Sequence, residues 1–137
     1  MKITKKHIND LSFQIIGCAN EVHRELGPGL LESIYEKCFI IELKKRGLKV
    51  SSQQLVPLQY KGIDLDSNLR LDIIVEDLII VELKSVENMI PLFKAQLLSY
   101  MKLASKPKGL LINFNSENIS SQIVSLVNDI FAKLDDE

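Results

Sequence analysis

The stretch from Arg70 to Lys84, RLDIIVEDLIIVELK, constrains the fold more than any other part of the chain. Two β-branched apolar runs flank a Glu-Asp step, which is typical of two adjacent buried strands joined by a tight turn. Burying an unpaired charge is costly, yet these strands carry Asp72, Glu82 and Lys84. Glu82 and Lys84 are two residues apart, so in a strand both project from one face. Such a group is either an internal ion pair or a metal-dependent hydrolytic site.

The loop between these strands decides whether the two carboxylates can act together. A two-residue loop at Glu76 and Asp77 would pair Asp72 with Val81 and put Asp72 and Glu82 on opposite faces of the sheet. A common metal site needs both carboxylates on the same face. We therefore predict an odd-numbered loop, or a bulge near Asp72, that brings Asp72 opposite Glu82.

Composition places limits on the class of protein. A chain of 137 residues with 46% hydrophobic and 26% charged residues predicts one globular domain spanning residues 1–137. No apolar run approaches the roughly 20 residues that cross a bilayer, so no membrane segment is expected. Cys18 and Cys38 lack metal-ligand spacing and are expected to be free thiols of a cytoplasmic protein. A net charge of −1 argues against a strong non-specific grip on nucleic acid but leaves room for a local groove.

Apolar periodicity predicts the remaining elements. Spacings of three and four predict helices at residues 5–26, 30–46, 91–105 and 119–134. Strands are predicted at residues 49–60, within 70–84 as two strands, and at 109–114, with a turn at 61–68. Pro57 limits the first strand to a sheet edge or a bulge. The order α-α-β-β-β-α-β-α predicts an α/β fold, a mixed four-stranded sheet flanked by helices.

The helix at residues 30–46 carries two neighbouring stripes. The main apolar stripe is Leu31, Ile34, Cys38 and Ile41, and the adjoining stripe is Glu32, Tyr35 and Phe39. Glu32 has two interpretations: an acid that faces the positive end of the helix dipole, or an acid that points into the fold interior. This helix alone favours the dipole interpretation.

Two polar residues lie near inward helix faces. His23 is either a hydrogen-bonded packing residue or part of a site. Gln96 has Leu92, Phe93 and Tyr100 one turn away and lies on a largely apolar stripe. A buried glutamine needs partners for its amide, and a carboxylate or a bound phosphate would supply them, whereas an exposed one needs none.

These residues in this order resemble a known family. Asp72 followed by Glu82-Leu83-Lys84 on the next strand resembles the signature of the PD-(D/E)XK nuclease superfamily, with Leu71 where the signature has proline. Residues 29–35, GLLESIY, fit the pattern GxxExxY. With QLLSY at residues 96–100 and GLLINF at 109–114, the chain resembles the GxxExxY protein family, a branch of that superfamily, from about Val22 to Asn115.

The resemblance implies a restriction-endonuclease-like core and a role for each matching residue. Asp72 and Glu82 would bind the metal with the Leu83 carbonyl, Lys84 would be the catalytic lysine, and Glu32 would be the acid of the first core helix. Gln96 would complete the catalytic set. The candidate substrate contacts are Tyr35, Tyr100 and His23. The implied activity is phosphodiester hydrolysis of nucleic acid, usually DNA, with Mg²⁺, for which Mn²⁺ can substitute.

Residue chemistry agrees with this activity. Phosphodiester hydrolysis needs an activated water and a clamp on developing negative charge, and carboxylates suit Mg²⁺. Two alternatives stay open: a nuclease fold that binds nucleic acid or protein without cutting, and a structural core with an internal Lys84–Glu82 pair. A homodimer is compatible with the sequence, and no membrane partner is expected.

Overall fold

The computed structural model describes residues 2–137, which form a five-stranded sheet with helices on both faces. In chain order the elements are α1 (Lys5–Leu26), α2 (Glu32–Lys45), β1 (Val50–Tyr60), β2 (Ile63–Val75), β3 (Ile79–Lys84), α3 (Pro91–Leu103), β4 (Lys108–Asn113), the 3₁₀ helix η1 (Ile119–Gln122), β5 (Ile123–Val127) and α4 (Asp129–Ala132). The strands lie in the order β1-β2-β3-β4-β5, with β3 and β4 parallel and the other neighbours antiparallel. The predicted α/β fold with a mixed sheet flanked by helices is confirmed.

The predicted number of strands was wrong. The stretch 119–134 was expected to be one amphipathic helix, but it contains η1, the strand β5 and the short helix α4. β5 pairs antiparallel with β4, and Ile112 lies opposite Ile123. The apolar spacing in this stretch fits a helix, yet an edge strand completes the hydrogen bonding of β4, which is buried along its whole length.

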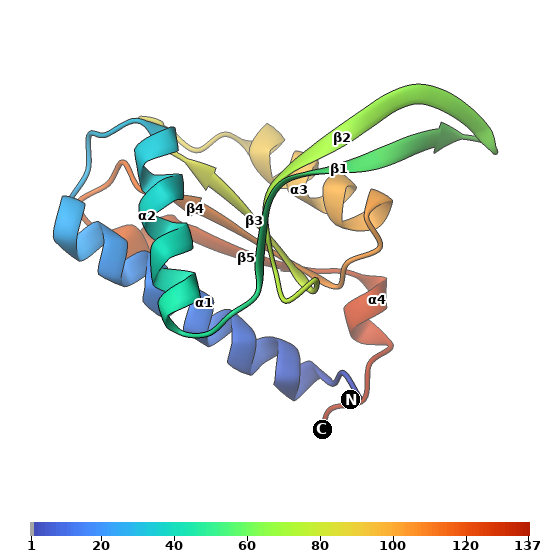
Figure 1. Ribbon diagram of the computed structural model, residues 1–137, viewed down its shortest axis with the longest axis horizontal. Coiled ribbons are helices and arrows are strands. Elements are labelled where there is room, and N and C mark those ends of the chain that lie inside the picture. The colour runs from blue at the N-terminus through green and yellow to red at the C-terminus, as the bar shows by residue number, and fades with distance from the viewer. Residues whose placement is uncertain (1) are drawn as a thin grey trace.

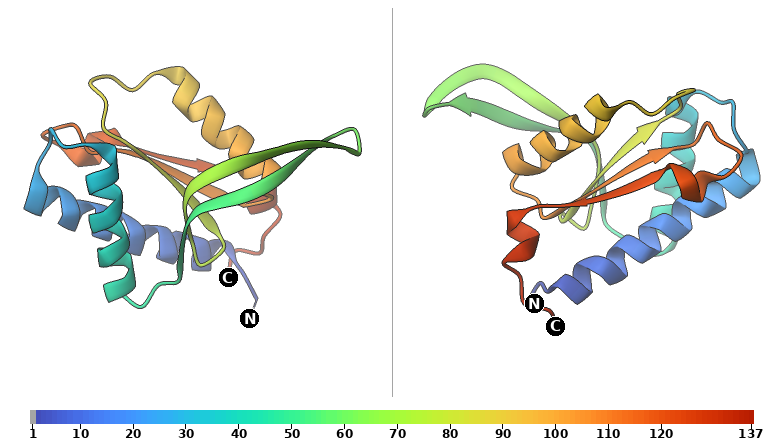
Figure 2. Two further views of the ribbon diagram at one scale, coloured as in Figure 1. Left: turned by 45° about the horizontal axis from the view of Figure 1, so that its top comes forward. Right: turned by 180° about the vertical axis from the view of Figure 1, so that it is seen from behind.

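Two hydrophobic clusters hold the helices to the sheet. α1 and α2 cover one face and α3 covers the other (Figures 1 and 2). Ile73 and Val81 belong to the cluster on the α1–α2 face, whereas Ile74 and Ile80 belong to the cluster beneath α3. Because neighbouring residues of a strand point to opposite faces, the apolar runs of β2 and β3 supply both clusters.

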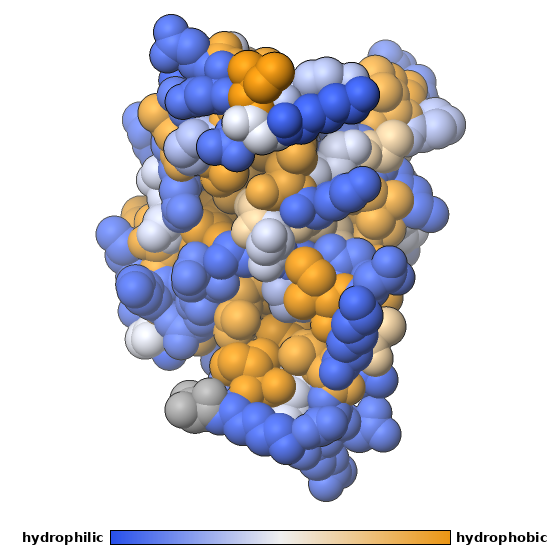
Figure 3. Space-filling model, turned by 90° about the vertical axis from the view of Figure 1, so that its right-hand side faces the viewer, coloured by the Kyte–Doolittle hydropathy of each residue, from blue (hydrophilic) through white to orange (hydrophobic). Residues whose placement is uncertain are grey.

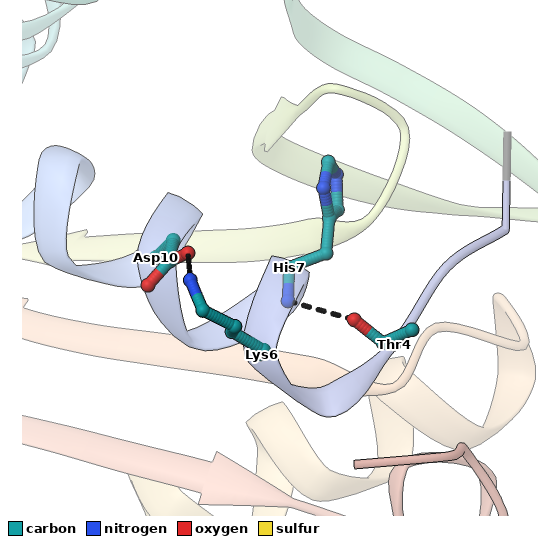
Figure 4. A network of polar contacts seen from close by, with 4 residues as sticks. All are labelled: Thr4, Lys6, His7 and Asp10. Atoms are coloured by element: carbon teal, nitrogen blue, oxygen red, sulfur yellow. Dashed lines mark hydrogen bonds and ion pairs between the residues drawn. The ribbon is translucent and has the colours of Figure 1, made fainter. Parts of the chain in front are cut away.

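The first helix begins where the sequence predicts. The Thr4 hydroxyl accepts a hydrogen bond from the His7 amide at 3.1 Å, and Lys6 pairs with Asp10 one turn along the helix (Figure 4). This cap satisfies one of the free amides at the helix start. The backbone of Lys5 also donates to the Asp135 carbonyl at 2.8 Å, so the two ends of the chain lie side by side (Figure 1). No helix among residues 2–137 combines the length and hydropathy needed to cross a bilayer.

α2 buries the stripe that was expected to be secondary. Tyr35, Phe39 and Leu43 are buried, whereas Leu31 and Ile41 are 73% and 53% exposed. The assignment of Leu31, Ile34, Cys38 and Ile41 as the main core stripe was therefore wrong. The stripe of Tyr35 and Phe39 is the one that is buried because both rings pack against Phe114. Tyr35 stacks on Phe114 at 4.6 Å between ring centroids, and Phe39 meets Phe114 edge-on.

β1 and β2 extend beyond the sheet as a long hairpin (Figure 1). Residues 61–68 were predicted to be a turn, but the turn is limited to Lys61 and Gly62, both with positive φ, and β2 begins at Ile63. We call residues 57–68 the arm. Pro57 fits both of its predictions, because β1 is an edge strand and its register shifts between Pro57 and Gln59. Figure 3, which faces the side from which the arm extends, shows apolar patches separated by hydrophilic side chains.

The connection between β2 and β3 has an odd length, as predicted. The strands end at Val75 and resume at Ile79, so the loop consists of Glu76, Asp77 and Leu78. Val75 pairs with Ile79 and Ile73 with Val81. The next step of this register sets Asp72 opposite Glu82, so the two carboxylates share a face.

Candidate functional site

Asp72 and Glu82 form the centre of the candidate site. Glu82 is only 7% exposed, and its Oε1 atom has no hydrogen-bond partner among the described residues. Burial, followed by a hydrogen bond with Asp72 and the charge of that residue, raises the pKa of Glu82 to about 9. A buried carboxyl oxygen without a partner is rare in a folded protein and indicates an unfilled binding capacity. Because its pKa is about 9, Glu82 holds its proton at neutral pH when no cation is bound.

Lys84 follows Glu82 on the same strand but does not neutralise it directly. Its ammonium lies over the ring of Phe93, 4.5 Å from the ring centroid. The ion pairs among residues 2–137 do not include a pair between Lys84 and Glu82. The alternative of a structural core held by such a pair is therefore not supported. Phe93 holds the cation by its ring electrons and leaves the ammonium hydrogens free for other contacts.

Glu32 enters the site from α2. It is the first residue of that helix and stays accessible to solvent. Partial burial of its carboxyl raises the pKa of Glu32, the charge of Asp72 raises it further, and the charge of Lys84 lowers it. Glu32 therefore lies near enough to both residues to feel their charges. Its location at the helix start fits the dipole interpretation, whereas its exposure contradicts the interpretation in which it points into the fold interior.

α3 supplies two polar side chains beside the carboxylates. Burial raises the pKa of Tyr100, and the charges of Glu82 and Asp72 raise it further, so the Tyr100 hydroxyl lies within range of the charge of the acid pair. Gln96 lies one turn before Tyr100 on the same helix and is partly buried. Its side chain makes no hydrogen bond to another of residues 2–137, which leaves its amide free. The partial burial of Gln96 agrees with its predicted position on an inward stripe of the helix.

Two of the residues predicted to contact the substrate instead make hydrogen bonds to other parts of the protein. Tyr35 is fully buried, and its hydroxyl donates to the Gly27 carbonyl at 2.6 Å and accepts from the Leu30 amide at 3.1 Å. His23 Nε2 donates to the Ser116 carbonyl, in the loop after β4. Tyr35 is therefore not available to a substrate, and the bond from one ring nitrogen of His23 to the Ser116 carbonyl agrees with the packing interpretation of that residue.

The sequence analysis missed residues that shape the site. Phe93 supports Lys84, and its signal was its position one turn before Gln96. Asn113 is buried at the end of β4, opposite Lys84, and its side chain accepts from the Val86 amide at 3.1 Å and donates to the Val86 carbonyl at 3.0 Å. These two bonds fix the chain where it leaves β3. A polar residue that ends an apolar strand was the available signal.

The oxygen atoms of this site suit a hard divalent cation. Within residues 2–137 no group of three or more histidine, cysteine or acidic side chains is gathered closely enough to hold a metal. The available side-chain ligands are the Asp72–Glu82 pair, and Mg²⁺ typically takes one or two carboxylates and keeps several waters. The unpartnered Oε1 of Glu82 fits this requirement because a cation would supply its missing partner.

Comparison with known proteins agrees with the geometry. A family model described as the PD-(D/E)XK nuclease superfamily matches residues 9–126, which run from within α1 to within the strand β5. No curated protein and no solved structure matches this chain. Because the match covers most of the chain, the protein belongs to the PD-(D/E)XK nuclease superfamily.

Proposed function

We propose that this protein is a divalent-metal-dependent nuclease that hydrolyses phosphodiester bonds of nucleic acid, with DNA as the favoured substrate. The observation that carries the proposal is the buried Glu82 beside Asp72, with one oxygen unpartnered and Lys84 two residues further along the strand. Within the superfamily, the GLLESIY match to GxxExxY supports a place in the GxxExxY family. Its two free cysteines fit a reducing, cytoplasmic setting, and residues 1–137 would act as one domain.

The residues divide the chemistry among them. Asp72, Glu82 and the Leu83 carbonyl would hold Mg²⁺ or Mn²⁺, with Glu32 at the edge of the coordination shell. When bound, the cation supplies an activated water and stabilises negative charge on the phosphate. The Lys84 ammonium orients that water or neutralises charge on the phosphate. Gln96 and Tyr100 would contact the substrate from α3.

Electrostatics also links metal binding to substrate binding. Asp72, Glu82 and Glu32 outnumber the single cation of Lys84, so the ionised site without metal repels a phosphate backbone. Neutral Glu82 reduces this repulsion but also removes a ligand. Nucleic acid should therefore bind more tightly when Mg²⁺ is present than in EDTA. Added salt alone would have the opposite effect, because it weakens binding to the phosphate backbone.

The test is cleavage of labelled nucleic acids by wild type and Lys84→Ala at equal protein concentration. Single- and double-stranded DNA and RNA are each offered with Mg²⁺, Mn²⁺ or EDTA. Lys84→Ala should lose a factor of about 10² to 10³ in rate, as is typical for removal of a transition-state stabiliser. It should keep the rise in melting temperature that Mg²⁺ causes in wild type, because lysine is not a ligand.

Two controls make the result specific. Lys133→Ala removes an exposed positive charge near the C-terminus and should leave the rate unchanged. Asp72→Asn should lose both cleavage and the metal-dependent rise in melting temperature. Equal rates for wild type and Lys84→Ala would assign any activity to a contaminant. Wild type that binds DNA and never cuts it would support a binding module in place of a nuclease.

A further inference from the structure

The loop Gly27–Leu31 determines where Glu32 lies, but α2 does not secure its own start. Leu31 occupies the cap position of α2 and makes no side-chain hydrogen bond to the helix. A helix start normally relies on a polar cap to satisfy its free amides. Contacts from outside the helix terminus therefore add to the backbone bonds that hold Glu32 in place.

Leu30, two residues before Glu32, is held at both of its backbone polar groups. Its amide donates to the Tyr35 hydroxyl at 3.1 Å, and its carbonyl accepts from Ser85 Oγ at 2.5 Å. The Tyr35 hydroxyl also donates to the Gly27 carbonyl at 2.6 Å, so one side chain spans the loop. Ser85 directly follows Lys84, which ties this loop to the end of β3.

A second route also connects Tyr35 to the end of β3. The Tyr35 ring stacks on Phe114 at 4.6 Å, with the ring planes 10° apart. The Phe114 amide in turn donates to the Lys84 carbonyl at 2.9 Å. Tyr35 is fully buried, so its ring is locked by packing and its hydroxyl is presented in one direction.

We propose that Tyr35 and Ser85 are positioning residues that hold Glu32 beside Asp72 and Lys84. This inference rests on the proposed function, because Glu32 is useful there only if the carboxylates hold a cation. It replaces the substrate contact that the sequence suggested for Tyr35 with an indirect role. Removing a group that hydrogen-bonds a metal ligand commonly lowers metal affinity about tenfold or more. Tyr35 and Ser85 act one step further away, through the Leu30 backbone, so we expect a loss at the lower end of this range.

A conservative substitution separates positioning from packing. Tyr35→Phe keeps the ring and its stacking on Phe114 but removes both hydrogen bonds to the loop. Ser85→Ala removes the bond to the Leu30 carbonyl with little change in volume. The matched control is Tyr60→Phe, since Tyr60 lies on the arm and is 59% exposed.

The experiment is a double-mutant cycle of Tyr35→Phe with Glu32→Gln, read by the dissociation constant of Mn²⁺ in calorimetry. Tyr35→Phe should weaken Mn²⁺ binding about tenfold when Glu32 is present and should have no further effect in Glu32→Gln. Ser85→Ala should act in the same direction, and Tyr60→Phe should have no effect. An equal loss in both backgrounds, or no loss, would overturn the positioning role.

A metal-free measurement distinguishes failure of this inference from failure of the proposed function. In ¹³C-labelled protein the Glu32 carboxyl resonance should shift on Asp72→Asn, because the charge of Asp72 acts on the Glu32 carboxyl. Tyr35→Phe should reduce that response, and Tyr60→Phe should preserve it. A reduced response in protein that neither binds Mn²⁺ nor cleaves would support the positioning and reject the nuclease. An unchanged response in Tyr35→Phe would reject the positioning by itself.

Discussion

The burial of Glu82 makes its carboxylate charge unfavourable and couples the stability of the fold to pH. Its pKa of about 9 is far above the ordinary value of 4.5, with burial as the main cause. The unfolded chain releases this proton near pH 4.5, whereas the folded protein without metal keeps it until near pH 9. Rising pH within that window therefore favours the unfolded state.

The corresponding prediction concerns stability in EDTA. As pH rises from about 5 to about 7, the Glu82 contribution should lower the free energy of unfolding by an amount of the order of 2 kcal/mol. Glu82→Gln should abolish this contribution, because its amide does not titrate. Glu117→Gln, an exposed acid after β4, is the control. Urea unfolding at several pH values measures this pH dependence of the free energy of unfolding. Parallel pH profiles for wild type and Glu82→Gln would contradict the claim that folded Glu82 stays protonated.

The individual site residues were predictable from sequence to different degrees. Asp72, Glu82 and Lys84 stand out because charges interrupt apolar strands, and the odd loop between β2 and β3 follows from requiring one face for both acids. The hydrogen bonds of Tyr35 could not be predicted. Its hydroxyl partners lie in a loop, and the Ser85 bond to Leu30 joins residues far apart in the chain. Periodicity carries no information about such bonds.

At the scale of elements, the local sequence pattern gave the wrong prediction wherever contacts with distant parts of the chain determine the structure. Residues 61–68 have the composition of a turn, but antiparallel pairing with β1 extends most of them into strand. β5 has apolar spacing that also fits a helix, and its hydrogen bonds to β4 decide the outcome. α2 has two candidate stripes, and the position of Phe114 selects the aromatic one. None of these partners is visible in the local sequence.

The choice of stripe on α2 is testable with two substitutions on one helix. Phe39→Ala should lower the free energy of unfolding by about 3–5 kcal/mol, because it leaves a cavity beneath the helix. Ile41→Ala should change it by less than about 1 kcal/mol, since Ile41 is 53% exposed. Urea denaturation of both variants measures the difference. A larger loss for Ile41→Ala would show that the helix is rotated toward the stripe that the sequence suggested.

At the scale of the whole molecule, the candidate site draws on both layers of helices. Glu32 comes from α2 on one face, Tyr100 from α3 on the other, and the acid pair from the strands between them. The arm lies outside this arrangement, and its large apolar residues Tyr60, Ile63 and Leu65 are exposed. The fold and the candidate site should therefore not depend on the arm.

Shortening the arm tests this division directly. Val56 pairs with Leu69, so replacing residues 57–68 with Asn-Gly leaves a two-residue hairpin turn between paired positions. The melting temperature should change by less than about 5 °C, because few buried contacts are lost. The rise caused by Mg²⁺ should persist, because Asp72 and Glu82 keep their register. Loss of that rise would contradict the separation of arm and site, whereas weaker DNA binding with the rise intact would assign the arm to the substrate.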